Sequence, residues 1–384
     1  MRAARRTQRL PTGGLTSLLG AGREYGAVDL AVGTPEWPAP PENLVAQAAS
    51  AVAGYNQYES PEGVRALREQ IAAALGAAGD PVDPETELTV TVGASEGLCV
   101  ALLSVVDPGD EVIVFEPSYE NFLGGIALSG GCPRWVRADS AGRVDPDDLA
   151  AAFGPRTKAV VVNTPNNPTG HVLTREELDV LGALCERHDT TVISDEVYAR
   201  YVFDGRRHVS VAEIPSLRDR SVVVGSLSKS HAISGWRIGF VRANPALSSV
   251  LRRVHIATTA GAAGPLQRAV VQSGALTERD WDPTAGMQRN RDRVVELFSR
   301  AGLECLVPEG GCYVLADIRP VTERASDEFA KRLLVEAGIV VAPGRYFFGS
   351  GAGGDELVRI AFNRRSETLD EVERRLAAFG TVAG

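Results

Sequence analysis

The most informative stretch of this chain reads Ser226-Leu227-Ser228-Lys229-Ser230-His231-Ala232-Ile233-Ser234-Gly235-Trp236-Arg237-Ile238-Gly239. It follows the apolar run Val222-Val223-Val224, which predicts a buried parallel strand. Lys229 then comes just past the carboxyl end of a strand, where open α/β sheets bind their ligands. Burial and neighbouring cations such as Arg237 lower the pKa of a lysine amine, so Lys229 is a candidate nucleophile that forms a Schiff base. A solvated surface lysine is the alternative.

Strands and helices alternate along most of the chain. Apolar runs predict strands, and apolar residues at spacings of three and four predict the helices between them. The strands are expected at 88–92, 111–115, 133–137, 160–163, 191–194 and 222–225, with helices at 96–106 and 121–129. This alternation is typical of the α/β class, in which helices cover both faces of a mainly parallel sheet.

The pattern changes after about residue 288. A long amphipathic helix, a second helix over 325–336 and short strands around Val340 and Val358 indicate a smaller α+β domain. The first 45 residues are loop-rich and are expected to belong to that domain. We therefore predict a large domain over 46–285 and a small domain made of 1–45 and 286–384.

Composition excludes several classes of protein. The 384 residues can bury a large core, and the net charge of −9 argues against general nucleic-acid binding. No apolar run reaches membrane-spanning length, and no apolar segment of a secretory signal follows the basic start of the chain. Five cysteines without CxxC spacing predict buried free thiols in a reducing cytoplasm, and five scattered histidines give no indication of a metal site.

Small residues lead directly from the first predicted strand into a helix. They read Gly93-Ala94-Ser95-Glu96-Gly97. Free backbone N–H groups at a helix start, together with the helix dipole, bind anions such as phosphate. The alternative is a tight turn capped by Ser95, and both interpretations can hold together.

Two further polar segments follow predicted strands. The loop Asn163-Thr164-Pro165-Asn166-Asn167-Pro168-Thr169-Gly170 is made rigid by two prolines, and it is either a ligand contact through Asn167 or only a turn. Asp195 follows the strand 191–194, and a buried carboxylate is costly unless a cation pairs with it. A protonated heterocyclic nitrogen is such a cation, and Tyr198 can add a hydroxyl to the same ligand.

Together these motifs resemble the fold-type I pyridoxal-phosphate enzymes, specifically the class I/II aminotransferases of the aspartate and kynurenine aminotransferase type. Six separated motifs occur in the order of the family, and the resemblance extends from about Val28 to the end of the chain. It implies a fold with a large cofactor-binding domain and a smaller domain. It also implies that Lys229 holds pyridoxal 5′-phosphate as an internal aldimine and then acts as base and acid in the 1,3-proton shift. Asp195 would keep the pyridine nitrogen protonated, so that the ring withdraws electrons.

The resemblance assigns the remaining cofactor contacts. Asn167 and Tyr198 would bind the 3′-oxygen, and Tyr119 would stack on the pyridine ring. The phosphate would be bound by Gly93, Ala94, Ser95, Ser226 and Arg237. Tyr58 matches a tyrosine that reaches the phosphate of the partner subunit, which implies a homodimer with shared active sites.

Substrate contacts are implied in the same way. Arg359 matches the arginine whose two-pronged guanidinium holds the substrate α-carboxylate, and a surface ion pair is the alternative reading of this residue. Gly33 matches a glycine whose backbone approaches the same carboxylate, with Asn167 nearby. Trp37 is expected to form a wall of the side-chain pocket.

The resemblance predicts an aminotransferase that moves an amino group from an L-amino acid to a 2-oxo acid by a ping-pong mechanism. The residues of the loop 258–264 are small and uncharged, and no second arginine can be placed near the site, which favours a neutral or aromatic donor.

His231 stands where many relatives have an aromatic residue. It is either a packing substitute for that residue or a proton-transfer group. The second reading favours an alternative enzyme, one that catalyses elimination, replacement or cyclisation on an amino acid in secondary metabolism. A non-catalytic binding protein is disfavoured, because the residues needed for cofactor chemistry are all present.

Overall fold

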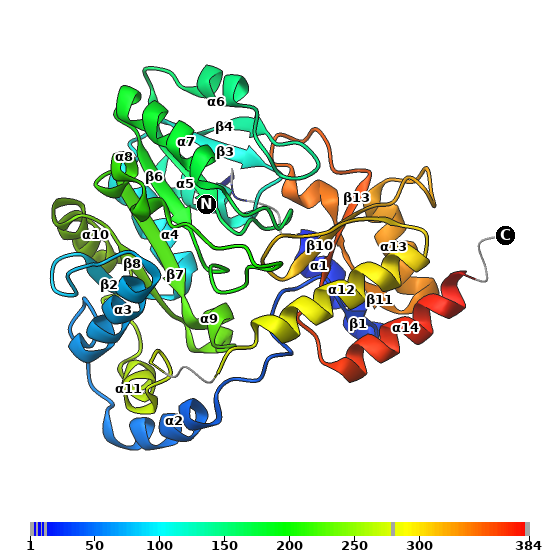
Figure 1. Ribbon diagram of the computed structural model, residues 1–384, viewed down its shortest axis with the longest axis horizontal. Coiled ribbons are helices and arrows are strands. Elements are labelled where there is room, and N and C mark those ends of the chain that lie inside the picture. Colours follow the sequence, from blue (N-terminus) through cyan, green and yellow to red (C-terminus); the bar gives the residue numbers. More distant parts are fainter. Residues whose placement is uncertain (1–3, 5–6, 9, 11–13, 278–280, 381–384) are drawn as a thin grey trace.

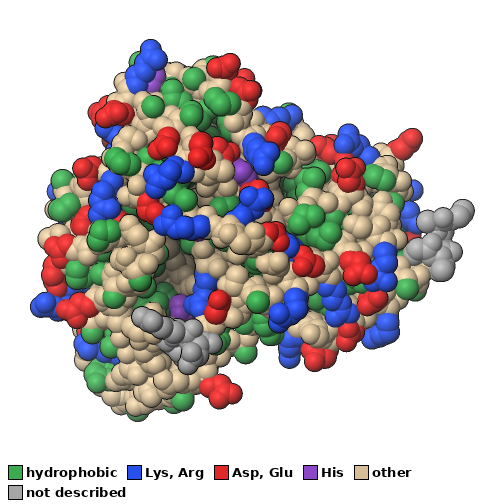
Figure 2. Space-filling view, in the orientation of Figure 1, with side chains coloured by type: hydrophobic (Ala, Val, Ile, Leu, Met, Phe, Trp, Pro, Cys, Tyr) green, Lys and Arg blue, Asp and Glu red, His purple; other side chains and the backbone are tan. Residues whose placement is uncertain are grey.

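The computed structural model describes residues 4, 7–8, 10, 14–277 and 281–380. Its elements are arranged around two larger β-sheets (Figure 1), one built from the middle of the chain and one from the C-terminal quarter. In Figure 2, basic and acidic side chains are interspersed over the visible face, in keeping with the small net negative charge.

The central sheet has seven strands in the described part of the chain, in the order β2-β8-β7-β6-β5-β3-β4. Their bounds are β2 Leu88–Val92, β3 Glu111–Glu116, β4 Cys132–Arg137, β5 Thr157–Asn163, β6 Thr191–Asp195, β7 Ser221–Ser226 and β8 Ile238–Arg242. The five strands from β3 to β7 pair in parallel, and all six predicted strands are present. The mainly parallel α/β sheet is therefore confirmed.

β8 is the strand that the sequence analysis missed. It pairs antiparallel with both β2 and β7, so it reverses the chain direction within the sheet. Its first two residues end the lysine stretch quoted above, and Gly239 and the buried Arg242 interrupt the apolar pattern that predicts a strand. The antiparallel register brings Gly239 beside Ser226, at the carboxyl end of β7.

Helices cover both faces of the central sheet because its strands alternate their side chains between two cores. Ala159 and Val161 of β5 pack on one face, with α4 (Gly93–Val105), α5 (Asn121–Ser129) and α10 (Pro245–Thr258). Val160 and Val162 face the other side, with α6 (Pro146–Ala152), α7 (Arg175–His188), η2 (Val211–Glu213) and α8 (Pro215–Arg218). α4 begins three residues earlier than expected, directly where β2 ends.

A third group of helices packs beside β2 and β8. It consists of α2 (Glu42–Gly54), α3 (Arg65–Ala78) and α11 (Gly264–Ser273), which share a core with both strands. α2 and α11 lie at the lower left of Figure 1. This arrangement brings the segment after α2 close to the loop before α11.

The C-terminal part contains an antiparallel sheet with the order β12-β13-β10-β9. The strands are β9 Glu304–Leu306, β10 Tyr313–Asp317, β12 Ala342–Pro343 and β13 Leu357–Ala361. The helices that cover it are α12 Thr284–Arg300, α13 Ser326–Ala337 and α14 Ser366–Gly380, with the short η4 Gly344–Phe347.

The N-terminal segment packs against this C-terminal part. β1 (Val28–Asp29) pairs in parallel with β11 (Ile339–Val340). The segment is less loop-rich than the sequence indicated, because residues Gly14–Glu24 form the helix α1. Leu18 and Leu19 of α1 pack against a small core that includes Val340, and this packing stabilises a helix that sequence periodicity alone did not predict.

The cysteines are free but not uniformly buried. Cys185 and Cys312 are buried and Cys99 and Cys305 are half-buried, whereas Cys132 is exposed at the start of the edge strand β4. The expectation of five buried thiols was therefore wrong for Cys132. Within the described residues, every helix is too short or too polar to cross a bilayer.

A buried histidine links the two parts of the molecule. His171, in the loop after β5, is 3% exposed, with Nδ1 3.0 Å from Oε2 of Glu309 and Nε2 2.9 Å from Oε1 of Glu177. Both ring nitrogens face carboxylates, an arrangement that favours the doubly protonated, cationic ring. Burial lowers the pKa of His171, but Glu177 and then Glu309 outweigh it, and the net pKa is raised. Glu309 also accepts from the backbone N–H of Val172 and pairs with Arg206.

We predict that His171→Gln destabilises the protein in a pH-dependent way. When folding raises the pKa of a histidine, the charged ring stabilises the folded protein. This contribution is fully present below the pKa of the unfolded chain, about 6.5, and is lost as the pH rises through the pKa of the folded protein. The variant should lose about 2 kcal/mol near pH 6, because two partly buried carboxylates lose their cation.

The measurement is the midpoint of thermal unfolding of both proteins between about pH 6 and pH 9. The difference between them should shrink as the pH rises. His188→Gln is the matched control, since within the described chain His188 has no carboxylate partner. A difference that stays constant or grows with pH would contradict the assignment.

Candidate active site

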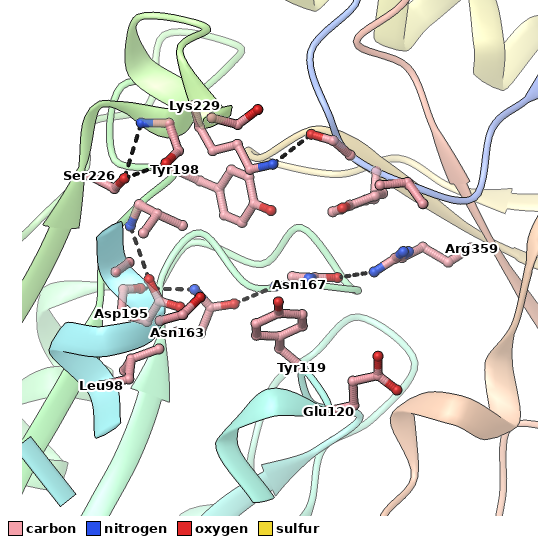
Figure 3. Close-up of a pocket in the computed structure, with 18 of the residues that line it drawn as sticks. Leu98, Tyr119, Glu120, Asn163, Asn167, Asp195, Tyr198, Ser226, Lys229 and Arg359 are labelled. Carbon is pink, nitrogen blue, oxygen red and sulfur yellow. Dashed lines mark hydrogen bonds between the residues drawn. The ribbon is translucent and has the colours of Figure 1, made fainter. Parts of the chain in front are cut away.

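A cavity of about 240 Å³ lies where the carboxyl ends of the central strands meet the C-terminal sheet. Three neighbouring strands end in polar residues that line it, namely Asn163 of β5, Asp195 of β6 and Ser226 of β7. Figure 3 shows these side chains on one side of the cavity and Arg359 of β13 on the other. The parallel register brings the strand ends together, as the sequence predicted.

Lys229 projects into this cavity from the short helix α9 (Leu227–Ser230). The hydroxyl of Ser226 caps α9 by accepting from the N–H of Ser228 at 3.0 Å, which fixes the turn directly after β7. Nζ of Lys229 donates to the carbonyl oxygen of Gly33 at 2.6 Å. Burial lowers the pKa of Lys229, and the positive charge of Arg359 lowers it further. Both effects raise the fraction of free amine.

Asp195 is a buried carboxylate without a cationic contact. It is 4% exposed, and its side chain accepts one hydrogen bond, from the N–H of Val197 at 3.3 Å. Burial raises its pKa to about 7. Within the described chain no arginine or lysine pairs with it, so the site favours a cationic ligand atom beside this carboxylate.

The start of α4 and Arg237 form an anion-binding corner. Gly93 has φ +71°, and a Cβ at this position would lie 2.3 Å from Nη2 of Arg237, so only glycine permits the close approach. Arg237 donates to the carbonyl oxygen of Ser234 at 2.8 Å and has no carboxylate partner in the described chain. Ala94, Ser95, Ser226 and Ser228 line the same corner. Unpaired helix N–H groups, hydroxyls and a guanidinium together fit a phosphate.

Arg359 is a buried cation without a carboxylate. It is 3% exposed; Nη1 donates to Oδ1 of Asn167 at 2.8 Å and Nη2 to the carbonyl oxygen of Ala31. Its guanidinium carbon lies 3.8 Å from the ring centre of Tyr313 and 4.5 Å from that of Phe347, and Nε has no partner in the described chain. The alternative reading of Arg359 as a surface ion pair was therefore wrong.

Most of the predicted site residues meet in this cavity. Those that line it are Gly33, Ala94, Ser95, Tyr119, Asn167, Asp195, Tyr198, Ser226, Lys229, Arg237 and Arg359. Gly93 lies behind the lining, against Arg237. Their convergence from both parts of the molecule agrees with the predicted grouping.

Two predicted residues, Trp37 and Tyr58, lie away from the cavity. Trp37 lines a separate small cavity on the other side of Lys229, and its ring packs against Gly286. Tyr58 is 95% exposed and lies beside a surface depression formed by 56–59 and 259–265. Neither side chain contributes to the cavity within a single chain.

His231 also points away from the cavity. Its Nε2 lies 3.2 Å from the carbonyl oxygen of Ala275, and its ring stacks on Trp281 at 5.4 Å between centres. Burial lowers its pKa to about 4, so the ring is neutral at pH 7. These contacts support the packing reading of His231 rather than proton transfer.

Nine residues that line the cavity were not predicted from the sequence. They are Val32, Leu98, Glu120, Asn163, Val197, Ser228, Ser234, Tyr313 and Phe347. Asn163 and Ser228 lie within the motifs already quoted, so their position at strand ends was a usable signal. Tyr313 and Phe347 depend on how the second sheet meets the first, which no local pattern encodes.

Comparison with known proteins agrees with this geometry. The family described as aminotransferase class I and II matches residues 26–376. The arginine–pyruvate transaminase AruH of Pseudomonas aeruginosa is 38% identical over 91% of this chain and 88% of its own length. Kynurenine–oxoglutarate transaminase 1 of Rattus norvegicus is 33% identical over 92% of each chain.

Solved structures extend the likeness to the whole fold. N-succinyldiaminopimelate aminotransferase from Mycobacterium tuberculosis has a TM-score of 0.94 and 31% identity, with 100% of both chains covered. YbdL from Escherichia coli, described with a methionine aminotransferase function, has a TM-score of 0.93 and 32% identity over 98% of this chain and 99% of its own. Family match, relatives and fold agree, and the chain is therefore a member of the pyridoxal-phosphate-dependent class I and II aminotransferases of fold type I.

Proposed function

We propose that this aminotransferase takes its amino group from an L-amino acid with a neutral or aromatic side chain and passes it to a 2-oxo acid in a second half-reaction. The observation that carries this proposal is a cavity lined by four ionisable groups that have no counter-ion in the described chain, namely the buried Asp195 and Arg359 and the half-buried Lys229 and Arg237. Isolated buried charges are costly in a protein unless a ligand neutralises them.

These residues fit pyridoxal 5′-phosphate. The unpaired carboxylate of Asp195 suits a protonated ring nitrogen, and the corner formed by α4 and Arg237 suits a phosphate. Asn167 uses Oδ1 to accept from Arg359, which leaves Nδ2 to donate to the 3′-oxygen beside the hydroxyl of Tyr198. Tyr119 would lie against the ring. When bound, the cofactor supplies a carbonyl that reacts with amines and a ring that withdraws electrons.

Lys229 would move the protons. Its burial and neighbouring cations favour the uncharged amine, which can accept the proton that leaves the substrate Cα. The same Nζ can return a proton later in the half-reaction, so that one group serves as base and acid. The aromatic side chains of Tyr313 and Phe347 cover Arg359 and exclude water from its guanidinium.

Arg359 would orient the substrate. Its planar guanidinium can bind both oxygens of an α-carboxylate, and its contact with Asn167 ties that anion site to the cofactor site. Gly33 lies nearby, where its carbonyl oxygen accepts from Lys229. The carboxylate would thereby hold Cα within reach of Nζ.

The expected donor follows from the charges of the lining residues. The cations that line the described cavity are Lys229, Arg237 and Arg359, and each already has a role. A second carboxylate on the substrate would find no free cation, which supports a neutral or aromatic side chain. The contacts of His231 remove the argument that favoured elimination, replacement or cyclisation.

A half-reaction tests this function. Cofactor-loaded enzyme mixed with one amino acid and no oxo acid should convert stoichiometrically to the pyridoxamine form and release one oxo acid per site. Phenylalanine should react with a higher kcat/KM than aspartate, and Lys229→Ala should bind the cofactor without converting it. Repeated turnover that releases ammonia without an oxo-acid acceptor would instead identify an elimination enzyme, and a strong preference for aspartate would contradict the proposed donor.

A second prediction concerns Arg359→Lys. A lysine keeps the charge but cannot bind a carboxylate through two parallel hydrogen bonds. We expect kcat/KM for phenylalanine to fall about 10- to 100-fold, since hydrogen bonds to charged groups contribute about 1.5–3 kcal/mol each. Cofactor affinity, measured by absorbance titration, should change little. Equal losses in cofactor binding and in kcat/KM would show that Arg359 supports the cofactor site instead.

We also propose a homodimer, with residues 46–285 as the large domain of each subunit and 1–45 with 286–384 as the small one. Several apolar side chains near Tyr58 are exposed in the single chain, among them Val45, Val52 and Tyr55. Such a patch is typical of a surface that binds another protein. Free cysteines support a cytoplasmic location.

The role of Tyr58 gives a further test. If its hydroxyl reaches the cofactor phosphate of the partner, Tyr58→Phe should weaken cofactor binding about tenfold, as expected for one hydrogen bond to a charged group. Tyr55→Phe is the control, because that ring contacts Arg268 within its own chain. Light scattering should give twice the mass of one chain. A monomer with unimpaired cofactor binding would contradict the dimer.

A further inference from the structure

We infer that Glu120 selects amino donors whose side chain ends in a cation, by placing an unpaired carboxylate in the wall of the active-site cavity. The inference rests on the proposed aminotransferase function and widens the donor class stated above, which was neutral or aromatic. Among side chains of similar shape, it adds donors that end in a cation and ranks them above uncharged ones, and it keeps the exclusion of acidic donors.

The position of Glu120 is fixed by the chain around it. It directly follows Tyr119, precedes α5 and lines the cavity. Figure 3 shows its carboxylate beside Tyr119, on the same side of the cavity as Arg359. Although Glu120 occupies the N-cap position of α5, its side chain makes no capping hydrogen bond. The fold therefore does not use this carboxylate to cap the helix.

Glu120 is also the one charged residue, among those described in the cavity lining, to which the proposed chemistry gives no role. Among the described lining residues, Asp195 would face the ring nitrogen, Arg237 the phosphate, Arg359 the α-carboxylate, and Lys229 the reacting carbon. The carboxylate of Glu120 has neither a hydrogen bond nor an ion pair in the described chain. The positive charge of Arg359 lowers the pKa of Glu120 through space, without an ion pair between the two side chains.

The environment acts on the charge of this group in opposite ways. Burial raises the pKa of Glu120, and Arg359 offsets that effect only in part, so the pKa is raised on balance. A cationic side chain beside the carboxyl favours its charged form. The amino end of α5 contributes a partial positive charge at the same place. A half-buried carboxylate of this kind stays hydrated in the open cavity and loses water when a substrate side chain covers it.

Desolvation explains the selectivity. An uncharged side chain that covers Glu120 removes its water and supplies no partner, so part of the binding energy is lost. An acidic side chain adds repulsion between like charges. An ammonium or guanidinium group replaces the lost water with a charge-assisted hydrogen bond. The discrimination thus acts on the distal end of the donor, while Arg359 holds its α-carboxylate.

The test compares lysine with norleucine, which has the same straight chain without the terminal amine. Specificity constants are measured for the cofactor-loaded full-length enzyme with one 2-oxo acid as acceptor. In Glu120→Gln the ratio of kcat/KM for lysine to that for norleucine should fall about tenfold, while kcat/KM for norleucine stays equal or rises. Glu120→Asp, which keeps the charge, should retain part of the preference.

Glu176→Gln is the matched control. Glu176 is exposed in the first turn of α7 and lies outside the active-site cavity, so the variant changes the net charge equally and should leave the ratio unchanged. A ratio that is the same in the wild type and Glu120→Gln would overturn the inference while norleucine turnover upholds the aminotransferase. Failure of every amino acid to react would reject the proposed function and this inference together.

Discussion

The active site depends on burying charges that the protein itself does not neutralise. Asp195 and Arg359 are nearly inaccessible to water, and each lacks a counter-ion in the described chain. In a protein that only had to be stable, such groups would be replaced or paired. Here the surrounding structure holds them in place: Asp195 accepts from the backbone N–H of Val197, and Arg359 donates to Asn167 and lies over the ring of Tyr313. A ligand of complementary charge that fills the cavity therefore neutralises these groups and stabilises the site.

The cavity also requires both parts of the molecule to be in place. One wall comes from the ends of parallel strands, and the other comes from β10, β13 and η4. The hydrogen bond between Asn167 and Arg359 joins the two walls inside the cavity, and His171 joins them outside it. Cofactor and substrate sites are therefore aligned by contacts between residues that are almost 200 positions apart in the sequence.

The parts of this site that could be predicted from sequence are those encoded locally. Lys229, Asp195 and Asn167 follow apolar runs, and parallel strands necessarily end at one edge, so their meeting was predictable. β8 was not, because Gly239 and Arg242 break its pattern and only its two neighbours make it a strand. Tyr313 and Phe347 likewise depend on packing between distant segments. For His231 the residue type was known, but its direction was set by Trp281, far along the chain.

The position of β8 has a consequence for how the polypeptide acquires its structure during synthesis. In the described sheet β2 pairs with β8 alone, so residues 88–92 have no sheet partner until the ribosome has produced residue 242. β1 lacks its partner for longer, because β11 ends at Val340. The nascent chain thus carries an unsatisfied apolar strand through more than a third of translation, a period in which chaperone binding or aggregation competes with native pairing.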